Sequence, residues 1–197
     1  MLHERYCVID VETTGFSPVY DRVVEIACAL VDGDRIVERW ATLVNPCIPI
    51  PPSATAIHGI TDEMVADAPV IESALRHARR LSGERVVAAH CARFDLSFVG
   101  GSMTGTALCT MLLARAIFPE APNHKNQTLR RYLRIDRVAG EELAAHRALG
   151  DALVTAHVLI ACRRRFRICR QGDSWERFIR RHALVKRPAG RADLHTQ

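Results

Sequence analysis

The sequence lacks the features that mark several large classes of protein. No two of its seven cysteines have the two-residue spacing of a zinc or redox motif, and their odd number argues against a disulfide framework. No glycine-rich loop follows the first predicted strand, which excludes a P-loop or a dinucleotide fingerprint there. The longest apolar run, residues 152–162, is too short to cross a bilayer, and the N-terminus does not resemble a signal peptide. These absences predict a cytoplasmic protein without a membrane segment.

The composition is that of an ordinary globular domain, but its charge is unevenly distributed. Of the 197 residues, 48% are hydrophobic and 25% are charged, which is enough to bury a core. Residues 1–162 carry a net charge of −3 and residues 163–197 a net charge of +8. The basic end is either a solvated helix and tail or a contact with nucleic acid, whose phosphates attract such segments. We predict one main domain over residues 1–170, followed by a basic C-terminal helix and tail over residues 171–197.

The apolar patterns predict an α/β fold. Three strands, the second and third joined through Asp32-Gly33, are followed by alternating helices and strands. This order predicts a mixed five-stranded sheet with helices on both faces. Residues 45–61 contain four prolines and are predicted to form an ordered loop without a helix or strand. Residues 173–187 are predicted to form one amphipathic helix. The strands are expected at residues 6–12, 22–31, 35–44, 85–90 and close to 107–110.

Four acidic residues lie where the pattern would otherwise call for buried apolar side chains. Asp10 and Glu12 share one face of the first strand, because residues two apart in a strand point to the same side. Asp95 follows a short buried strand, and Asp151 lies on the inward face of an apolar helix. Burying like charges costs several kcal/mol unless something compensates for it.

A metal centre would supply this compensation. Carboxylate oxygens in this number suit Mg²⁺ or Mn²⁺, and two such ions about 3.5–4 Å apart form the site that hydrolyses phosphodiesters by in-line attack of water. His146 is the candidate base for that water, since the reference pKa of histidine is near 6.5. It lies five residues before Asp151, about 140° away on a regular helix, so we place it on the loop that leads into the helix.

Each part of this pattern is weak alone. An Asp-x-Glu pair also occurs on exposed edge strands, and His90 has the same spacing to Asp95 as His146 has to Asp151. We interpret His90 as a packed residue at the end of a buried strand. His146 lies in a polar segment that leads into a helix, which leaves its side chain freer to move. The occurrence of all the parts in order, each in a suitable local context, indicates one catalytic site.

These parts resemble the motifs of the DEDDh, or DnaQ-like, 3′→5′ exonucleases, the family of the proofreading epsilon subunit of bacterial DNA polymerase III. The matching stretches are "DVETTGF" (10–16), "ATAIHGIT" (54–61), "HCARFDLSFV" (90–99) and "HRALGDALVT" (146–155). The resemblance covers about residues 5–165 and implies a ribonuclease H-like fold. It implies that Asp10, Glu12, Asp95 and Asp151 bind two divalent ions, Mg²⁺ or Mn²⁺, and that His146 is the general base. Cys91 departs from the family pattern, which usually has Asn at this place.

Four further residues are candidates for substrate binding. The resemblance implies that His58 touches the terminal nucleotide, although a loop histidine that holds backbone groups is an equal alternative. Thr13 and Gly15 are candidates to offer backbone N–H groups to the 3′ end, and Gly15 equally suits a turn. Phe94 is a candidate to stack on a base or to anchor the core beside Asp95.

The resemblance implies a metal-dependent exonuclease domain over residues 1–170 that releases 5′-mononucleotides from single-stranded or frayed 3′ ends of DNA. Two alternatives keep the fold: an exonuclease for RNA 3′ ends, and a non-catalytic nucleic-acid-binding subunit. A DNA polymerase subunit is the candidate protein partner. The C-terminal tail has no obvious motif for binding a sliding clamp, which favours a free-standing or a divergent epsilon-like enzyme.

Overall fold

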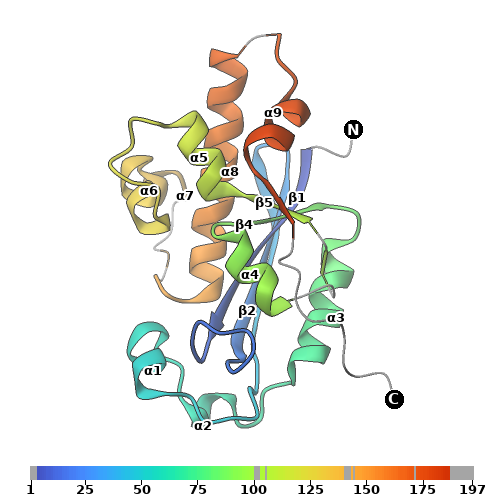
Figure 1. Ribbon diagram of the computed structural model, residues 1–197, viewed down its shortest axis with the longest axis vertical. Coiled ribbons are helices and arrows are strands. Elements are labelled where there is room, and N and C mark those ends of the chain that lie inside the picture. Colours follow the sequence, from blue (N-terminus) through green and yellow to red (C-terminus); the bar gives the residue numbers. More distant parts are fainter. Residues whose placement is uncertain are drawn as a thin grey trace.

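The computed structural model describes residues 4–99, 103–104, 106–139, 143, 145–170 and 172–186. A mixed six-stranded sheet in the order β3-β2-β1-β4-β5-β6 forms its centre, with helices on both faces (Figure 1). The strands are β1 (Arg5–Thr13), β2 (Val23–Asp32), β3 (Arg35–Leu43), β4 (Val86–Ala89), β5 (Thr106–Cys109) and β6 (Leu184–Lys186). The helices are α1 (Pro52–His58), α2 (Asp62–Val65), α3 (Ile71–Ser82), α4 (Ala92–Val99), α5 (Thr110–Ile117), α6 (Asn126–Tyr132), α7 (Ile135–Ala139), α8 (Ala148–Cys169) and α9 (Trp175–His182). The predicted α/β class is confirmed.

The two faces of β1 belong to different hydrophobic cores. Tyr6 and Val8 pack in the core that α8 covers, whereas Cys7 and Ile9 pack in the core beneath α3 and α4. Because side chains alternate along a strand, the even-numbered positions of β1 continue on the α8 face to the end of the strand. Asp10 and Glu12 hold the next two of these positions and so face the same side as α8.

The topology brings three elements to one edge of the sheet. Strand β4 runs parallel to β1, so α4, which follows β4, begins near the end of β1. Helix α8 packs across β1 and β2 and is buried around most of its circumference. Its N-terminal end lies near the same edge of the sheet (Figure 1). This arrangement gathers the acidic residues of the three motifs.

The sheet has one strand more than predicted. Residues 173–187 were expected to form a single helix, but α9 ends at His182 and β6 pairs antiparallel with β5. Val185 lies opposite Ala107, and both side chains are buried. The amphipathic pattern therefore located the helix, whereas the strand depends on pairing with residues about 80 positions earlier in the chain.

The prediction of a loop without elements over residues 45–61 is wrong, because α1 lies within it. Pro52 is the first residue of this helix, where the missing N–H of proline costs no hydrogen bond. The helix ends at Gly59, whose φ of 73° is readily adopted by glycine. One proline thus directly precedes the helix and the next is its first residue, so neither prevents a helix from forming.

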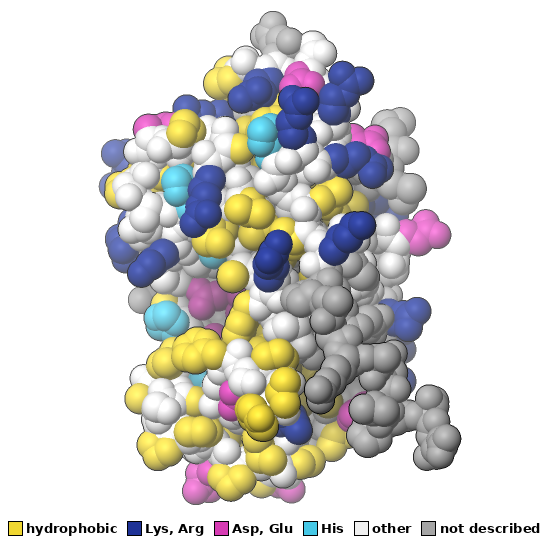
Figure 2. Space-filling model, viewed as in Figure 1, with side chains coloured by type: hydrophobic (Ala, Val, Ile, Leu, Met, Phe, Trp, Pro, Cys, Tyr) yellow, Lys and Arg dark blue, Asp and Glu magenta, His cyan; other side chains and the backbone are white. Residues whose placement is uncertain are grey.

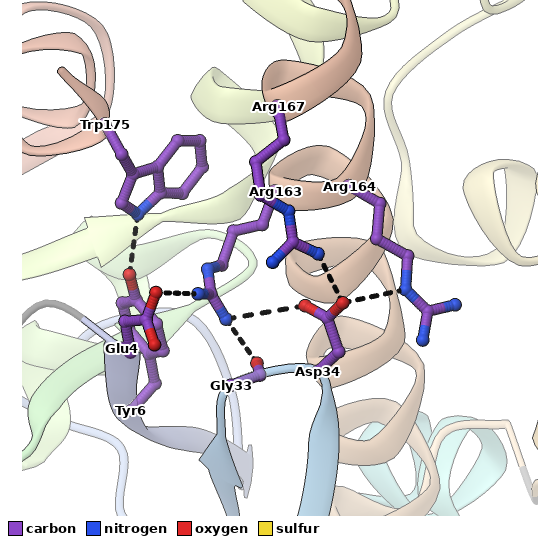
Figure 3. Close-up of polar contacts among 8 residues, drawn as sticks. All are labelled: Glu4, Tyr6, Gly33, Asp34, Arg163, Arg164, Arg167 and Trp175. Carbon is purple, nitrogen blue, oxygen red and sulfur yellow. Dashed lines mark hydrogen bonds and ion pairs between the residues drawn. The ribbon is translucent and has the colours of Figure 1, made fainter.

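At the far end of α8, charged side chains fasten the helix to the turn between β2 and β3 (Figure 3). The buried guanidinium of Arg163 donates to the carbonyl oxygen of Gly33 and pairs with Glu4 at 3.2 Å. Beside it, Trp175 donates from Nε1 to the hydroxyl oxygen of Tyr6 at 2.7 Å and so attaches α9 to β1. Three arginines of α8 pair with the carboxylate of Asp34: Arg163, Arg164 and Arg167.

These contacts help to decide whether the basic residues of the segment 163–197 belong to a solvated helix and tail or contact nucleic acid. A fourth arginine of α8, Arg165, pairs with Glu120. All four lie twelve to sixteen residues after Asp151, about 18–24 Å along the helix from it. Ion pairs within the fold therefore account for the arginines of α8, and phosphate contact is not needed to explain them.

The surface around the acidic edge is not uniform. In Figure 2, Lys and Arg side chains gather over the upper half of the face shown, and hydrophobic side chains cover its lower end. The exposed apolar residues include Phe16 and Tyr20 in the loop after β1, Ile57 in α1 and Met64 in α2. Of the helices in the described ranges, none has both the length and the apolar character that crossing a membrane requires.

Candidate active site

Three of the four predicted carboxylates form a compact cluster. Asp10, Glu12 and Asp151 offer oxygen atoms that all lie within 4.8 Å of one another. Asp95, which is 4% exposed, approaches from α4, and its charge raises the pKa of Asp10. The four acidic side chains of the sequence pattern are thus neighbours, although they come from three elements and both faces of the sheet.

Burial and mutual repulsion strongly disfavour the ionised form of these groups in the metal-free protein. Burial, followed by the charges of Asp95, Asp151 and Glu12, holds the pKa of Asp10 well above its usual range. Burial and the charge of Asp151 raise the pKa of Glu12 to about 8. Burial raises the pKa of Asp95 to about 7, against the effect of backbone N–H groups. The pKa of Asp151 is also raised, chiefly by burial.

The donor set fits hard divalent cations. Within the described residues, no Lys or Arg forms an ion pair with any of the four carboxylates. Carboxylate oxygens without sulfur or nitrogen ligands are the donors that Mg²⁺ and Mn²⁺ prefer. A bound cation would neutralise the repulsion that raises these pKa values. The residues present therefore suit a divalent metal centre.

This arrangement makes the stability of the metal-free protein depend on pH. The unfolded state loses the Glu12 proton near its reference pKa of about 4.3, whereas the folded state keeps it up to about 8. Between these values the unfolded state binds fewer protons, so the contribution of Glu12 to the free energy of unfolding falls as pH rises. We expect Glu12→Gln to be increasingly more stable than the parent between about pH 5 and pH 8 in EDTA. Chemical denaturation of both proteins measures the difference, and a difference independent of pH would contradict this account.

Two hydrogen bonds orient Asp151. Gln127 of α6 donates from Nε2 to Oδ1 at 2.6 Å, and the backbone N–H of His146 donates to Oδ2 at 3.0 Å. The neighbouring Asn126 donates to the Asp151 carbonyl oxygen and to Thr155. Sequence reasoning missed Gln127, because a polar residue in the first turn of a short helix gives no signal of its distant partner.

His146 lies on the approach to α8, as its spacing to Asp151 required. The helix begins at Ala148, so His146 is outside it, and its side chain is exposed. Its φ of 56° is in the left-handed region, which costs a non-glycine residue about 1–2 kcal/mol. Its backbone N–H donates to the carboxylate of Asp151, so His146 lies directly beside the carboxylate cluster.

His90, the histidine with the same spacing, is committed to structural contacts. It is 9% exposed, and its Nε2 lies 2.9 Å from the carbonyl oxygen of His124, to which it donates. Its Nδ1 therefore accepts from the hydroxyl of Thr110 at 3.0 Å. Burial lowers the pKa of His90 to about 4. A neutral ring with both nitrogens engaged is poorly suited to take a proton from water.

A cleft of about 270 Å³ adjoins the cluster and includes the four residues expected to bind substrate. Glu12 belongs to both the cleft and the cluster, and Phe16 and Ile57 add apolar walls. The rings of Phe16 and Phe94 lie with their centroids 6.3 Å apart. The expected substrate residues in its lining are Thr13, Gly15, His58 and Phe94.

His58 lines this cleft, and its ring is buried. Its Nδ1 accepts from the N–H of Ile60 at 3.0 Å, so the ring proton is on Nε2. That atom is buried and has no hydrogen-bond partner among the described residues. Burial lowers the pKa of His58, which keeps the ring neutral. The hydrogen bond from Ile60 supports the reading in which His58 holds backbone groups, and contact with the terminal nucleotide stays a prediction.

The loop after β1 is built tightly around Gly15. A Cβ atom at this position would lie 2.6 Å from the carboxylate of Asp21, so only glycine fits without a shift. Asp21 in turn accepts from the hydroxyl of Thr14 and the N–H of Ser17. The N–H of Thr14 donates to the carbonyl oxygen of Arg22 and is not free for a ligand. Gly15 therefore serves the close packing of the loop whether or not it also contacts substrate.

Known proteins are similar to this chain in sequence. Residues 7–159 match the exonuclease family (RNase_T). The DNA polymerase III PolC-type protein of Bacillus cereus is 36% identical over 168 residues, which make up 81% of this chain and 11% of that protein. The DNA polymerase III subunit epsilon-like protein of Rhodobacter capsulatus is 39% identical over 165 residues, 79% of this chain and 23% of that protein. The chain thus spans less than a quarter of the length of these relatives.

Solved structures show the same fold. Exonuclease X in complex with 5′ overhanging duplex DNA superimposes with a TM-score of 0.72 and 36% identity, over 87% of this chain and 95% of that chain. The nuclease domain of 3′hExo, a DEDDh family member bound to rAMP, shares the ribonuclease H-like fold with a TM-score of 0.65 at 16% identity. The chain belongs to the exonuclease family, and the resemblance of its motifs to those of the DnaQ-like exonucleases is confirmed at the level of the family.

Proposed function

We propose that this exonuclease hydrolyses the terminal phosphodiester bond at 3′ ends of DNA and releases 5′-mononucleotides. The observation that carries the proposal is the cluster of Asp10, Glu12 and Asp151 oxygens beside a cleft of about 270 Å³. The apolar lining of the cleft suits a nucleotide base, and the carboxylate cluster at its edge supports the proposal that the scissile phosphate is held there.

Asp10, Glu12, Asp95 and Asp151 are proposed to bind two divalent cations, Mg²⁺ or Mn²⁺. When bound, such ions neutralise the phosphate charge and stabilise the attacking and leaving oxygens of an in-line displacement. Gln127 keeps one oxygen of Asp151 in a fixed orientation through its hydrogen bond.

His146 is proposed to take the proton from the attacking water on a ring nitrogen. The new bond forms between the water oxygen and phosphorus, and the bond from phosphorus to the 3′ oxygen of the preceding nucleotide breaks. His146 suits this role because its side chain is exposed and its backbone N–H donates to the carboxylate of Asp151. His58 is proposed to donate from Nε2 to the terminal nucleotide, with Thr13, Gly15 and Phe94 forming the adjoining walls.

DNA is favoured as the substrate by the relatives. The bound DNA of Exonuclease X has a 5′ overhang, so the opposite strand ends in a recessed 3′ end. Both curated relatives are DNA polymerase III proteins, and we infer a role in proofreading or repair in the cytoplasm, with a polymerase subunit as candidate partner. We assign the chemistry to residues 1–170 and do not assign it to the basic segment 171–197.

Labelled oligonucleotides test this proposal. DNA and RNA strands labelled at the 5′ or the 3′ end are incubated with the protein in Mg²⁺, Mn²⁺ or EDTA. We expect 3′-labelled DNA to release labelled mononucleotide at once, 5′-labelled DNA to shorten stepwise, and EDTA to stop both reactions. Faster degradation of RNA would support the RNA alternative, and no hydrolysis in either metal would leave only the non-catalytic alternative.

A further inference from the structure

A buried carboxylate next to the active site anchors the residues that follow His146. Glu25 is 4% exposed and pairs with Glu12 in the register of β1 and β2, so it faces α8. Its Oε1 accepts from Arg147 Nη2 at 2.7 Å, and its Oε2 accepts from Arg147 Nε at 3.1 Å. Oε2 also accepts from the backbone N–H of Ala148 at 2.9 Å. Both oxygens of Glu25 are therefore engaged by the two residues after His146.

His146 needs this support because its own conformation is unfavourable. Its φ of 56° is rarely adopted by a residue with a side chain, and such conformations persist where the surroundings hold them. The preceding chain is held as well, since Arg130 Nη1 donates to the carbonyl oxygen of Leu143 at 2.6 Å. Directly after His146, Arg147 makes two hydrogen bonds to the carboxylate of Glu25.

We propose that Arg147 and Glu25 are positioning residues, which hold His146 beside the carboxylate cluster by fixing the chain next to it. This inference rests on the proposed function, in which His146 is the base. A misplacement of about 1 Å in a reacting group can cost up to 10²-fold in rate. The positive charge of Arg147 also offsets part of the repulsion that the neighbouring carboxylates, Glu25 among them, exert on Glu12.

Two other roles for Arg147 make different predictions. A purely structural ion pair would change stability and leave the kinetics of the folded enzyme unaltered. A direct contact with substrate is chemically feasible, because Nη1 has no hydrogen-bond partner in the described part of the chain and the side chain is 40% exposed. Loss of such a contact would raise KM, whereas loss of positioning lowers kcat.

Arg147→Lys is the most informative variant. Lysine keeps the positive charge but cannot make the two parallel hydrogen bonds of the guanidinium. We expect kcat on a 3′-labelled DNA oligonucleotide to fall about tenfold, with KM within about twofold of the parent. Arg165→Lys is the matched control, since Arg165 is 38% exposed and also pairs with a glutamate, Glu120, but lies near the far end of α8. It is expected to leave both constants unchanged.

A double-mutant cycle with His146→Ala separates the possible outcomes. If Arg147 acts through His146, Arg147→Lys has almost no further effect on kcat in the His146→Ala background. An equal loss in both backgrounds, a rise in KM, or an unchanged kcat would each overturn the positioning role. The single variant His146→Ala tests the proposed role of His146 independently. An unchanged kcat in this variant would show that His146 is not the base.

Glu25→Gln provides the same test from the other partner. Glutamine keeps an oxygen that can accept from the N–H of Ala148 but loses the charge that holds Arg147. Thermal unfolding identifies the variants that fold, and kinetics are compared only among these. If Arg147→Lys does not fold, a loss of kcat in Glu25→Gln that disappears in the His146→Ala background supports the proposal. An unchanged kcat in folded Glu25→Gln contradicts it.

Discussion

Asp10→Ala is expected to reduce hydrolysis on the order of 10³-fold or more, because a metal centre contributes several kcal/mol of transition-state stabilisation. The same change is expected to keep or to raise the stability of the metal-free protein. Burial and three neighbouring carboxylates hold the pKa of Asp10 far above its usual range, so its removal relieves repulsion. Rates on 3′-labelled DNA and chemical denaturation in EDTA measure the two effects.

The combination of lost activity and retained stability distinguishes a metal ligand from a structural residue. Asp151→Ala is expected to behave in the same way, although it also releases Gln127 from its hydrogen bond. Asp67→Ala, at an exposed position in the loop after α2, is the control for the loss of one carboxylate. If Asp10→Ala retained activity within a few-fold of the parent in Mg²⁺, the assignment of Asp10 to the metal centre would be wrong.

His146→Ala is expected to lower kcat by about 10²–10⁴-fold, the usual contribution of a general base. Metal binding is expected to stay close to that of the parent, since the ring of His146 is not among the proposed ligands. The backbone N–H that orients Asp151 is also present in alanine. Single-turnover rates and a calorimetric titration with Mn²⁺ measure the two properties separately.

His90→Ala is the control for this assignment. It leaves the carbonyl oxygen of His124 without its donor, which costs about 1–3 kcal/mol, and leaves the hydroxyl of Thr110 with only the carbonyl oxygen of Ala89 at 3.5 Å. We expect a lower melting temperature and little change in turnover per folded molecule. A folded His90→Ala protein without activity, together with an active His146→Ala protein, would exchange the roles of the two histidines.

The parts of the site that local sequence encodes could be predicted. The alternation of β1 placed Asp10 and Glu12 on one face, and the apolar periodicity of α8 turned Asp151 inward. The 140° between His146 and Asp151 on a regular helix required His146 to precede α8, which begins at Ala148. These conclusions need only the periodicity of one element each.

The parts that depend on contacts between distant residues could not be predicted in the same way. Strand β6 exists because Val185 pairs with Ala107, and Gln127 contacts Asp151 across 24 positions. The pair of Arg147 and Glu25 spans 122 positions. No periodicity within a segment reveals which partner a polar side chain finds in the fold. Helix α1 was missed for another reason. Its prolines were taken as residues that prevent a helix, whereas here they lie at its N-terminus.

Anomalous diffraction from a crystal soaked in Mn²⁺ and a nucleoside 5′-monophosphate tests the central claim most directly. The account predicts two anomalous peaks about 3.5–4 Å apart, bounded by the carboxylates of Asp10, Glu12, Asp95 and Asp151. It also predicts that the Asp10→Ala protein loses at least one of these peaks. Full Mn²⁺ sites elsewhere, with no peak between these four carboxylates in the parent protein, would contradict the account.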